Sequence, residues 1–257
     1  MKHSDPLAHF RFGYCLWLCV ALVLQWRTHL RWVRVRGRER ELPRLLDWLP
    51  MPRLETPGFA LVGLALVASL ATAAAPAENM AWALLLASAT ALMYFAQLIE
   101  LPDVRRKPNT VPVILLLLGL AGLATHGGES ERIAWLCLLA VKILVAQIYF
   151  SSGLVKLRQA GWRWALAPNL RIILLRYHLR DDSKAALWLA HRPAACRAVA
   201  ALVLVFELTF WLVIPFPALA WVYLPAGLIF HLGTAGLMRI HYWIYVVPAY
   251  FAFVVMR

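Results

Sequence analysis

The stretch that decides the fold is residues 133–150, which read IAWLCLLAVKILVAQIYF. Lys142 is its one charged residue. Its length is close to the roughly 20 residues that an α-helix needs to cross the ~30 Å hydrocarbon layer of a bilayer. Because a backbone in lipid must satisfy its own hydrogen bonds, such a run predicts a helix and not an isolated strand.

Similar apolar runs occur along the whole chain and predict about eight transmembrane helices. The full set of runs is 10–26, 58–75, 80–99, 111–125, 133–150, 194–216, 218–237 and 240–256. The composition agrees, because 62% of the 257 residues are apolar and 15% are charged, whereas soluble domains have about 45–50% and about 25%. We therefore expect a single all-α domain over residues 1–257, a polytopic integral membrane helical bundle.

Basic residues concentrate in alternate connections between these runs. The formal net charge is +13, from 26 Lys and Arg against 13 Asp and Glu. Most of the basic residues fall in the connections 27–55, 100–110 and 151–193. Basic loops favour the cytoplasmic side, so we expect a multi-pass protein of the inner (plasma) membrane with both termini non-cytoplasmic. The same charges favour anionic lipid headgroups, and not nucleic acid, as the partner.

Residues 169–180, NLRIILLRYHLR, are too charged to span a membrane but have the pattern of an amphipathic helix. Apolar side chains recur on one face at Leu170, Ile173, Leu174 and Tyr177. Arg176 and Arg180 share another face, and Asn169 is the expected N-cap. Two interpretations stay open: a helix lying in the membrane interface with its arginines at headgroups, or an amphipathic helix packed on the bundle.

Charged residues inside apolar runs are the sharpest functional signal in a membrane protein, because each costs about 2.5–3.5 kcal/mol at a helix centre. Lys142 and Glu207 lie near the middles of their runs, so we expect them to face the bundle interior and to pair. Such a pair either fixes the helix register or serves as a proton relay or substrate anchor. His231 and His241 have no evident third ligand, so no metal site is predicted.

The most distinctive local sequence is YFSSGLVKL at residues 149–157. Small residues at 151–153 allow neighbouring helices to approach closely. Lys156 therefore stands where a membrane helix meets a crowded, partly dry region, and lost hydration together with the nearby Arg158 favours a neutral amine. Such an amine would be usable as a general base, and the alternative is a lysine that extends to the aqueous interface.

This motif resembles the signature of the HTTM family, the membrane domain shared with vitamin K-dependent γ-glutamyl carboxylase. The residues that carry the resemblance are Tyr149, Gly153, Lys156, Leu157, Trp164 and Asn169. The later FHLG pattern at residues 230–233 is similar as well, and Glu207 matches an acidic position more loosely. The resemblance implies a small, bacterial-type member of that family.

The resemblance also implies an activity. In the carboxylase the matching lysine is taken to deprotonate reduced vitamin K. Oxygen then converts the quinol anion to a strong alkoxide. The alkoxide removes a γ-proton from a peptide glutamate, and carbon dioxide adds to the resulting carbanion. By position Lys156 would be the catalytic base, shielded from bulk water, and a reduced vitamin K-like quinone would be the cofactor. Glu207, Lys142 and His231 would be supporting polar groups, and a membrane-proximal peptide or a partner protein would be the partner.

Two other classes of function stay open. The chain could be a non-catalytic membrane scaffold or accessory subunit that assembles with a partner protein. It could also be a transporter in which Lys142 and Glu207 form a coupling pair, although no internal repeat favours transport.

Overall fold

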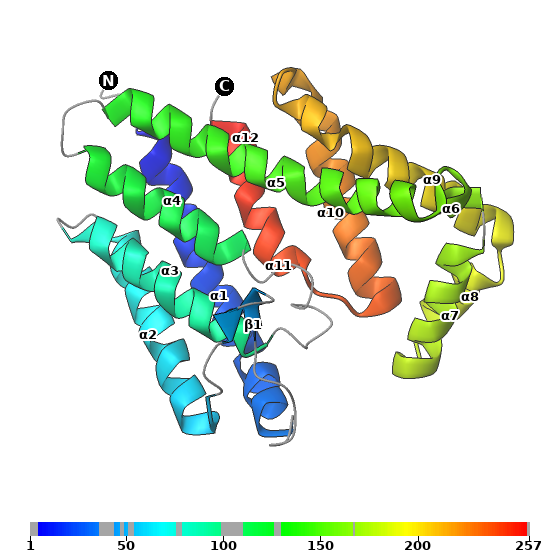
Figure 1. Ribbon diagram of the computed structural model, residues 1–257, viewed down its shortest axis with the longest axis horizontal. Coiled ribbons are helices and arrows are strands. Elements are labelled where there is room, and N and C mark those ends of the chain that lie inside the picture. Colours follow the sequence, from blue (N-terminus) through cyan, green and yellow to red (C-terminus); the bar gives the residue numbers. More distant parts are fainter. Residues whose placement is uncertain are drawn as a thin grey trace. The chain divides into compact units, whose positions relative to one another are not determined.

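The computed structural model describes most of the chain, and the described part is almost entirely helical (Figure 1). The described residues are 5–35, 44–46, 49–50, 54–75, 79–98, 110–125, 130–166 and 168–255. One short antiparallel pair of strands, β1 (Arg44–Leu46) and β2 (Leu49–Pro50), interrupts the helices. The chain divides into two compact units, one formed by Met1–Val141 with Ile244–Met256 and the other by Lys142–Trp243.

The first unit is built from long N-terminal helices and the C-terminal segment. Its elements are α1 (Pro6–Val35), α2 (Thr56–Ala74), α3 (Met80–Ala96), α4 (Thr110–Ala124), the beginning of α5 (Ser130–Ala160), η4 (Val247–Tyr250) and α12 (Phe251–Val255). Figure 1 shows α2, α3 and α4 side by side. Gly119 and Gly122 bring α4 against α3, because added Cβ atoms would lie 2.8 Å from Leu85 Cδ2 and 3.0 Å from the Ala81 Cβ.

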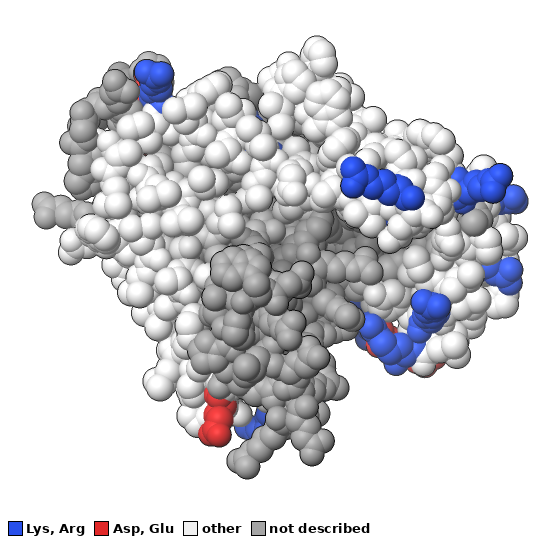
Figure 2. Space-filling model, in the orientation of Figure 1, with Lys and Arg blue, Asp and Glu red and all other residues white. Residues whose placement is uncertain are grey.

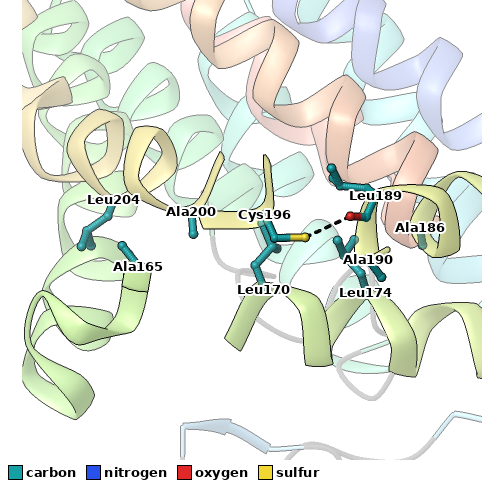
Figure 3. Close-up of a cluster of buried hydrophobic side chains, with 9 residues drawn as sticks. All are labelled: Ala165, Leu170, Leu174, Ala186, Leu189, Ala190, Cys196, Ala200 and Leu204. Atoms are coloured by element: carbon teal, nitrogen blue, oxygen red, sulfur yellow. Dashed lines mark hydrogen bonds between the residues drawn. The ribbon is translucent and has the colours of Figure 1, made fainter. Parts of the chain in front are cut away.

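The second unit contains the rest of α5 and a series of shorter elements. These are α6 (Arg163–Leu166), α7 (Asn169–Asp181), α8 (Lys184–Ala190), α9 (Pro193–Thr209), η2 (Phe210–Val213), η3 (Pro217–Leu219) and α10 (Ala220–Met238); α11 (Trp243–Val246) lies at the boundary between the units. Figure 3 shows the buried cluster where α6, α7, α8 and α9 meet. Leu170 and Leu174 of α7 lie there near Cys196, Leu189 and Ala190, and Leu204 lies beside Ala165 of α6. This cluster gives the connection after α5 a core of its own.

The eight predicted runs coincide largely with helical structure, but the count of about eight membrane spans is not confirmed. Among the described residues, five helical segments are long and apolar enough to cross a membrane: Pro6–Arg31, Thr56–Ala74, Glu131–Ala160, Pro193–Val213 and Pro217–Met238. The other three are shorter: Met80–Ala96, Thr110–Ala124 and Trp243–Val255. The 15 residues of α4 reach only about 22 Å. The last segment changes from α-helix to 3-10 helix around Pro248.

Two local expectations are corrected. The apolar run was expected to end at residue 150, whereas α5 continues to Ala160, and α6, α7 and α8 follow it. Asn169 is not an N-cap: that position is Pro168, and Asn169 is the first helical residue, whose Nδ2 donates to the Trp164 carbonyl over 3.1 Å. The asparagine therefore ties α7 back to α6.

Part of the evidence for orientation lies outside the described residues. These basic residues are Arg36, Arg38, Arg40, Arg53, Arg105, Arg106 and Lys107. Within the described residues, the basic side chains after α5 lie on or beside helices of the second unit.

Candidate functional site

Lys156 and Glu207 form the centre of the candidate site. Lys156 lies near the end of α5, Glu207 lies on α9, and Nζ of Lys156 donates to both carboxylate oxygens of Glu207. The Glu207 side chain is 3% exposed and the Lys156 side chain 20% exposed. The Lys156 side chain is thus mostly buried, which favours the shielded interpretation over a lysine that extends to the aqueous interface, and the carboxylate is almost fully buried.

Gly153 explains why the two helices come close enough for this contact. A Cβ at Gly153 would lie 3.0 Å from the Glu207 Cβ and 3.1 Å from Leu208 Cδ2. Lys156 follows Gly153 by about one helical turn and therefore projects from the same side of α5. The close helix approach predicted from the small residues is confirmed at this position.

Two further groups hold the Lys156 amine. Nζ donates to the Ser152 hydroxyl over 3.3 Å, one turn earlier on α5. The same nitrogen lies 5.3 Å from the ring centroid of Trp164 on α6, within the range of a cation–π contact. Asn169 in turn donates to the Trp164 carbonyl, so Trp164 and Asn169 of the motif both connect to the surroundings of this amine.

Tyr149 and His231 form a second buried polar pair in the same unit. The Tyr149 hydroxyl and His231 Nε2 share a hydrogen bond of 2.6 Å between α5 and α10. Their residues are 2% and 4% exposed. Aromatic rings surround the pair, with Phe210 and Phe206 centred 4.5 and 5.1 Å from the Tyr149 ring. Tyr149 precedes Lys156 by seven residues, so the two polar pairs lie about 10 Å apart along α5.

The predicted pairing of Lys142 with Glu207 is wrong. Lys142 precedes Lys156 by 14 residues on α5, which corresponds to about 21 Å along the helix axis. Glu207 contacts Lys156 instead, and the Lys142 residue is 9% exposed at another level of α5. This correction also removes the coupling pair on which the transporter interpretation rested.

The contact with Glu207 changes the chemistry expected of Lys156. The local sequence indicates two effects on the amine, its lost hydration and the nearby charge of Arg158. It does not indicate the third, the Glu207 carboxylate, because that residue lies on a helix about 50 residues later in the chain. An amine and a carboxylate in contact act as one proton-handling unit, since the carboxylate accepts a proton and the ammonium stabilises an adjacent anion. Leu157 is partly buried and contributes packing to the same turn.

Sequence reasoning missed Ser152 as a site residue and His29 with Tyr94 as a polar pair. The signal for Ser152 was its spacing of four residues from Lys156, which places both on one helix face. His29 Nδ1 and the Tyr94 hydroxyl share a hydrogen bond of 2.8 Å in the first unit, and the Tyr94 ring stacks on Phe59 with centroids 4.6 Å apart. That pair joins α1 to α3, which local sequence does not indicate.

The comparisons with known proteins give no family assignment. No family model, no curated protein and no solved structure matches the chain. Within the described residues, no group of three or more His, Cys, Asp or Glu side chains is placed to hold a metal ion.

Proposed function

We propose that this chain is a multi-pass membrane protein that removes a proton from a lipophilic quinol at the Lys156–Glu207 pair. The observation that carries the proposal is the position of Nζ: it contacts both oxygens of a buried carboxylate, yet a fifth of the lysine side chain is exposed. In this proposal the substrate approaches from the partly exposed lysine, and the almost fully buried carboxylate exchanges protons with the amine that it contacts. The HTTM resemblance of the motif supports the same substrate class, a reduced vitamin K-like quinone.

The chain's own residues can move the proton in one concerted exchange. Nζ of Lys156 takes the proton of the quinol hydroxyl and passes one of its own protons to a Glu207 carboxylate oxygen. The products are a quinol anion beside a lysine ammonium and a neutral Glu207, so the charge balances. Ser152 and Trp164 hold Nζ in place during the exchange. The quinol supplies the acidic hydroxyl and, with oxygen, the oxidation chemistry that the resemblance implies.

The first test measures quinone binding and turnover. The protein is purified with native lipid and analysed for a bound quinone, and oxygen-dependent quinol epoxidation is then compared between wild type, Lys156→Ala and Glu207→Gln. We expect both variants to lose 100-fold or more of the rate, on the order of a lost general base. Arg197→Ala, which removes an exposed cation from α9, is the control and should keep the rate. The proposal would be contradicted if the wild-type protein contained no bound quinone and did not turn over quinol.

A scaffold is the second candidate, because the same ion pair also joins α5 to α9. The double variant Lys156→Met with Glu207→Leu separates the two roles. Apolar pairs of similar volume commonly replace buried ion pairs without loss of stability, so this variant should fold but not turn over quinol. If instead the double variant retains partner binding and every function measured in cells, the pair is structural and the scaffold candidate is favoured.

We also propose an orientation for the membrane segments. The basic connections favour the cytoplasmic side of an inner membrane for the Lys156 end of α5, with both termini on the other side. Termini on the same side require an even number of crossings, so at least one of the three shorter apolar segments would cross as well. The five membrane-length segments support multiple crossings.

A further inference from the structure

Helix α7 has two apolar faces. Leu170 and Leu174 form the inner face and are buried in the cluster with α8 and α9 (Figure 3). Ile172 and Leu179 are seven residues apart on the outer side, where they are 43% and 83% exposed. Seven residues make about two helical turns, so the exposed pair forms a second stripe opposite the first. The inner stripe explains the packing of α7, and the outer stripe has no such role.

Arginines border the outer stripe on both sides. At 100° per residue, Arg176 and Arg180 lie beside it on one edge and Arg171 on the other, and all three are exposed. The Arg180 guanidinium lies 4.5 Å from the Tyr177 ring centroid, and its Nε donates to an Asp181 carboxylate oxygen over 2.9 Å. Figure 2 shows Lys and Arg side chains over the α7–α8 part of the molecule.

Helix α8 has the same division into an inner and an outer face. Ala186, Leu189 and Ala190 are buried in the cluster. Trp188 is 59% exposed, and the Arg192 guanidinium lies 3.8 Å from the centroid of its ring. An exposed tryptophan with an adjacent cation is typical of side chains at the boundary between lipid and water.

We infer that the outer faces of α7 and α8 bind the headgroup layer of an anionic bilayer. In this arrangement Leu179, Ile172 and Trp188 enter the boundary between headgroups and acyl chains, and the cations contact lipid phosphates. The proposal concerns a different surface from the Lys156–Glu207 pair and does not depend on the proposed quinol chemistry.

Two observations favour lipid over a soluble acidic protein. The α7–α8 surface continues directly into the membrane-length segment Pro193–Val213, which begins three residues after α8 ends. Residues 169–192 also carry five Lys and Arg against two acidic residues, Asp181 and Asp182, and Arg180 already engages Asp181. A bilayer surface is therefore adjacent and has the complementary charge.

The test places a nitroxide label on the outer stripe of the full chain. Leu179→Cys is introduced after the four native cysteines are changed to alanine, and the labelled protein is reconstituted in nanodiscs of phosphatidylcholine or of an equimolar mixture with phosphatidylglycerol. We expect the label to be relaxed by oxygen more than by an aqueous nickel chelate, most strongly in the anionic nanodiscs. A label equally accessible to the nickel chelate in both nanodiscs overturns the proposal and assigns the surface to a soluble partner.

A second measurement tests the arginines. Native mass spectrometry counts the phosphatidylglycerol that stays bound to wild type, Arg176→Gln, Arg180→Gln and the double variant. Each substitution should lower the preference for phosphatidylglycerol by about fivefold, the effect of one cation at an anionic surface. Arg132→Gln removes an exposed cation at the start of α5 and is the matched control. An equal loss in the control, or no loss in the double variant, contradicts a role for these arginines.

Discussion

Gly153 is the residue on which the geometry of the candidate site depends. Without a side chain it allows the Glu207 backbone to come near α5, and the carboxylate then reaches the amine one turn further on. The local sequence predicted this close approach, because consecutive small residues favour helix contact in membranes. It did not predict which acidic residue would be met, since that depends on how α5 and α9 are aligned.

We predict that Gly153→Leu separates the two helices. The new side chain has no room beside Glu207 and Leu208, so the free energy of unfolding should fall by about 1–3 kcal/mol, the usual cost of overpacking. Thermal unfolding in detergent measures the loss. Gly236→Leu on α10 is the matched control, because an added Cβ there meets nothing within 4 Å. Equal unfolding temperatures for the two variants would show that the α5–α9 contact is looser than described.

At the scale of the element, hydropathy predicts the existence of α5 but not where the helix ends. The apolar run predicted residues 133–150, whereas the helix extends over Ser130–Ala160. Lysine, arginine, glutamine and leucine are good helix formers, so the backbone continues after the apolar pattern stops. Lys156 was therefore expected in a connection and is found on a helix. Helical propensity indicates how far the backbone stays helical, whereas hydropathy indicates which part of the helix can lie in the hydrocarbon layer.

The junction between α7 and α8 depends on one residue in a left-handed conformation. Asp182 has φ 50° and ψ 40°, and its backbone N–H donates to the His178 carbonyl over 2.8 Å. The Ser183 hydroxyl then accepts from the Ala186 N–H and caps α8. The sequence analysis predicted an N-cap for α7 at Asn169, where Pro168 stands instead, and did not predict the serine cap of α8.

Substitutions of Asp182 should therefore raise or lower the free energy of unfolding according to how well the new residue tolerates the left-handed backbone conformation. Asp182→Gly removes the steric cost of the left-handed conformation and should raise the free energy of unfolding by up to about 1 kcal/mol, whereas Asp182→Val should lower it by about 1–2 kcal/mol. Thermal unfolding measures both variants. Lower stability for the glycine variant would mean that the aspartate side chain matters more than the backbone conformation.

For the whole molecule, the all-helical class and the membrane-type composition were predictable, but the count of about eight spans is not confirmed. Runs such as 111–125 read as apolar, yet α4 is too short to cross about 30 Å of hydrocarbon when straight. The contacts that position Glu207 and His231 come from helices distant in sequence, so their partners could not be deduced from local spacing.

The proposed orientation predicts opposite exposure for the two ends of α5. Cysteines introduced separately at Glu131 and Gln159, in a chain without native cysteines, should react with a membrane-impermeant maleimide from opposite sides. The Glu131→Cys site should label in intact cells, and Gln159→Cys only after the membrane is opened, because the basic connection faces the cytoplasm. Labelling from the same side would show that α5 does not cross the bilayer.

The ion pair between Lys156 and Glu207 also limits which substitutions the two positions can accept during evolution. Loss of one member leaves a single charge among apolar side chains, which is costly, whereas loss of both is tolerated. We expect descendants of this chain to keep the two positions or to exchange them together, through a short-lived intermediate of low stability. Covariation between positions 156 and 207 would then mark every lineage in which the two helices still meet.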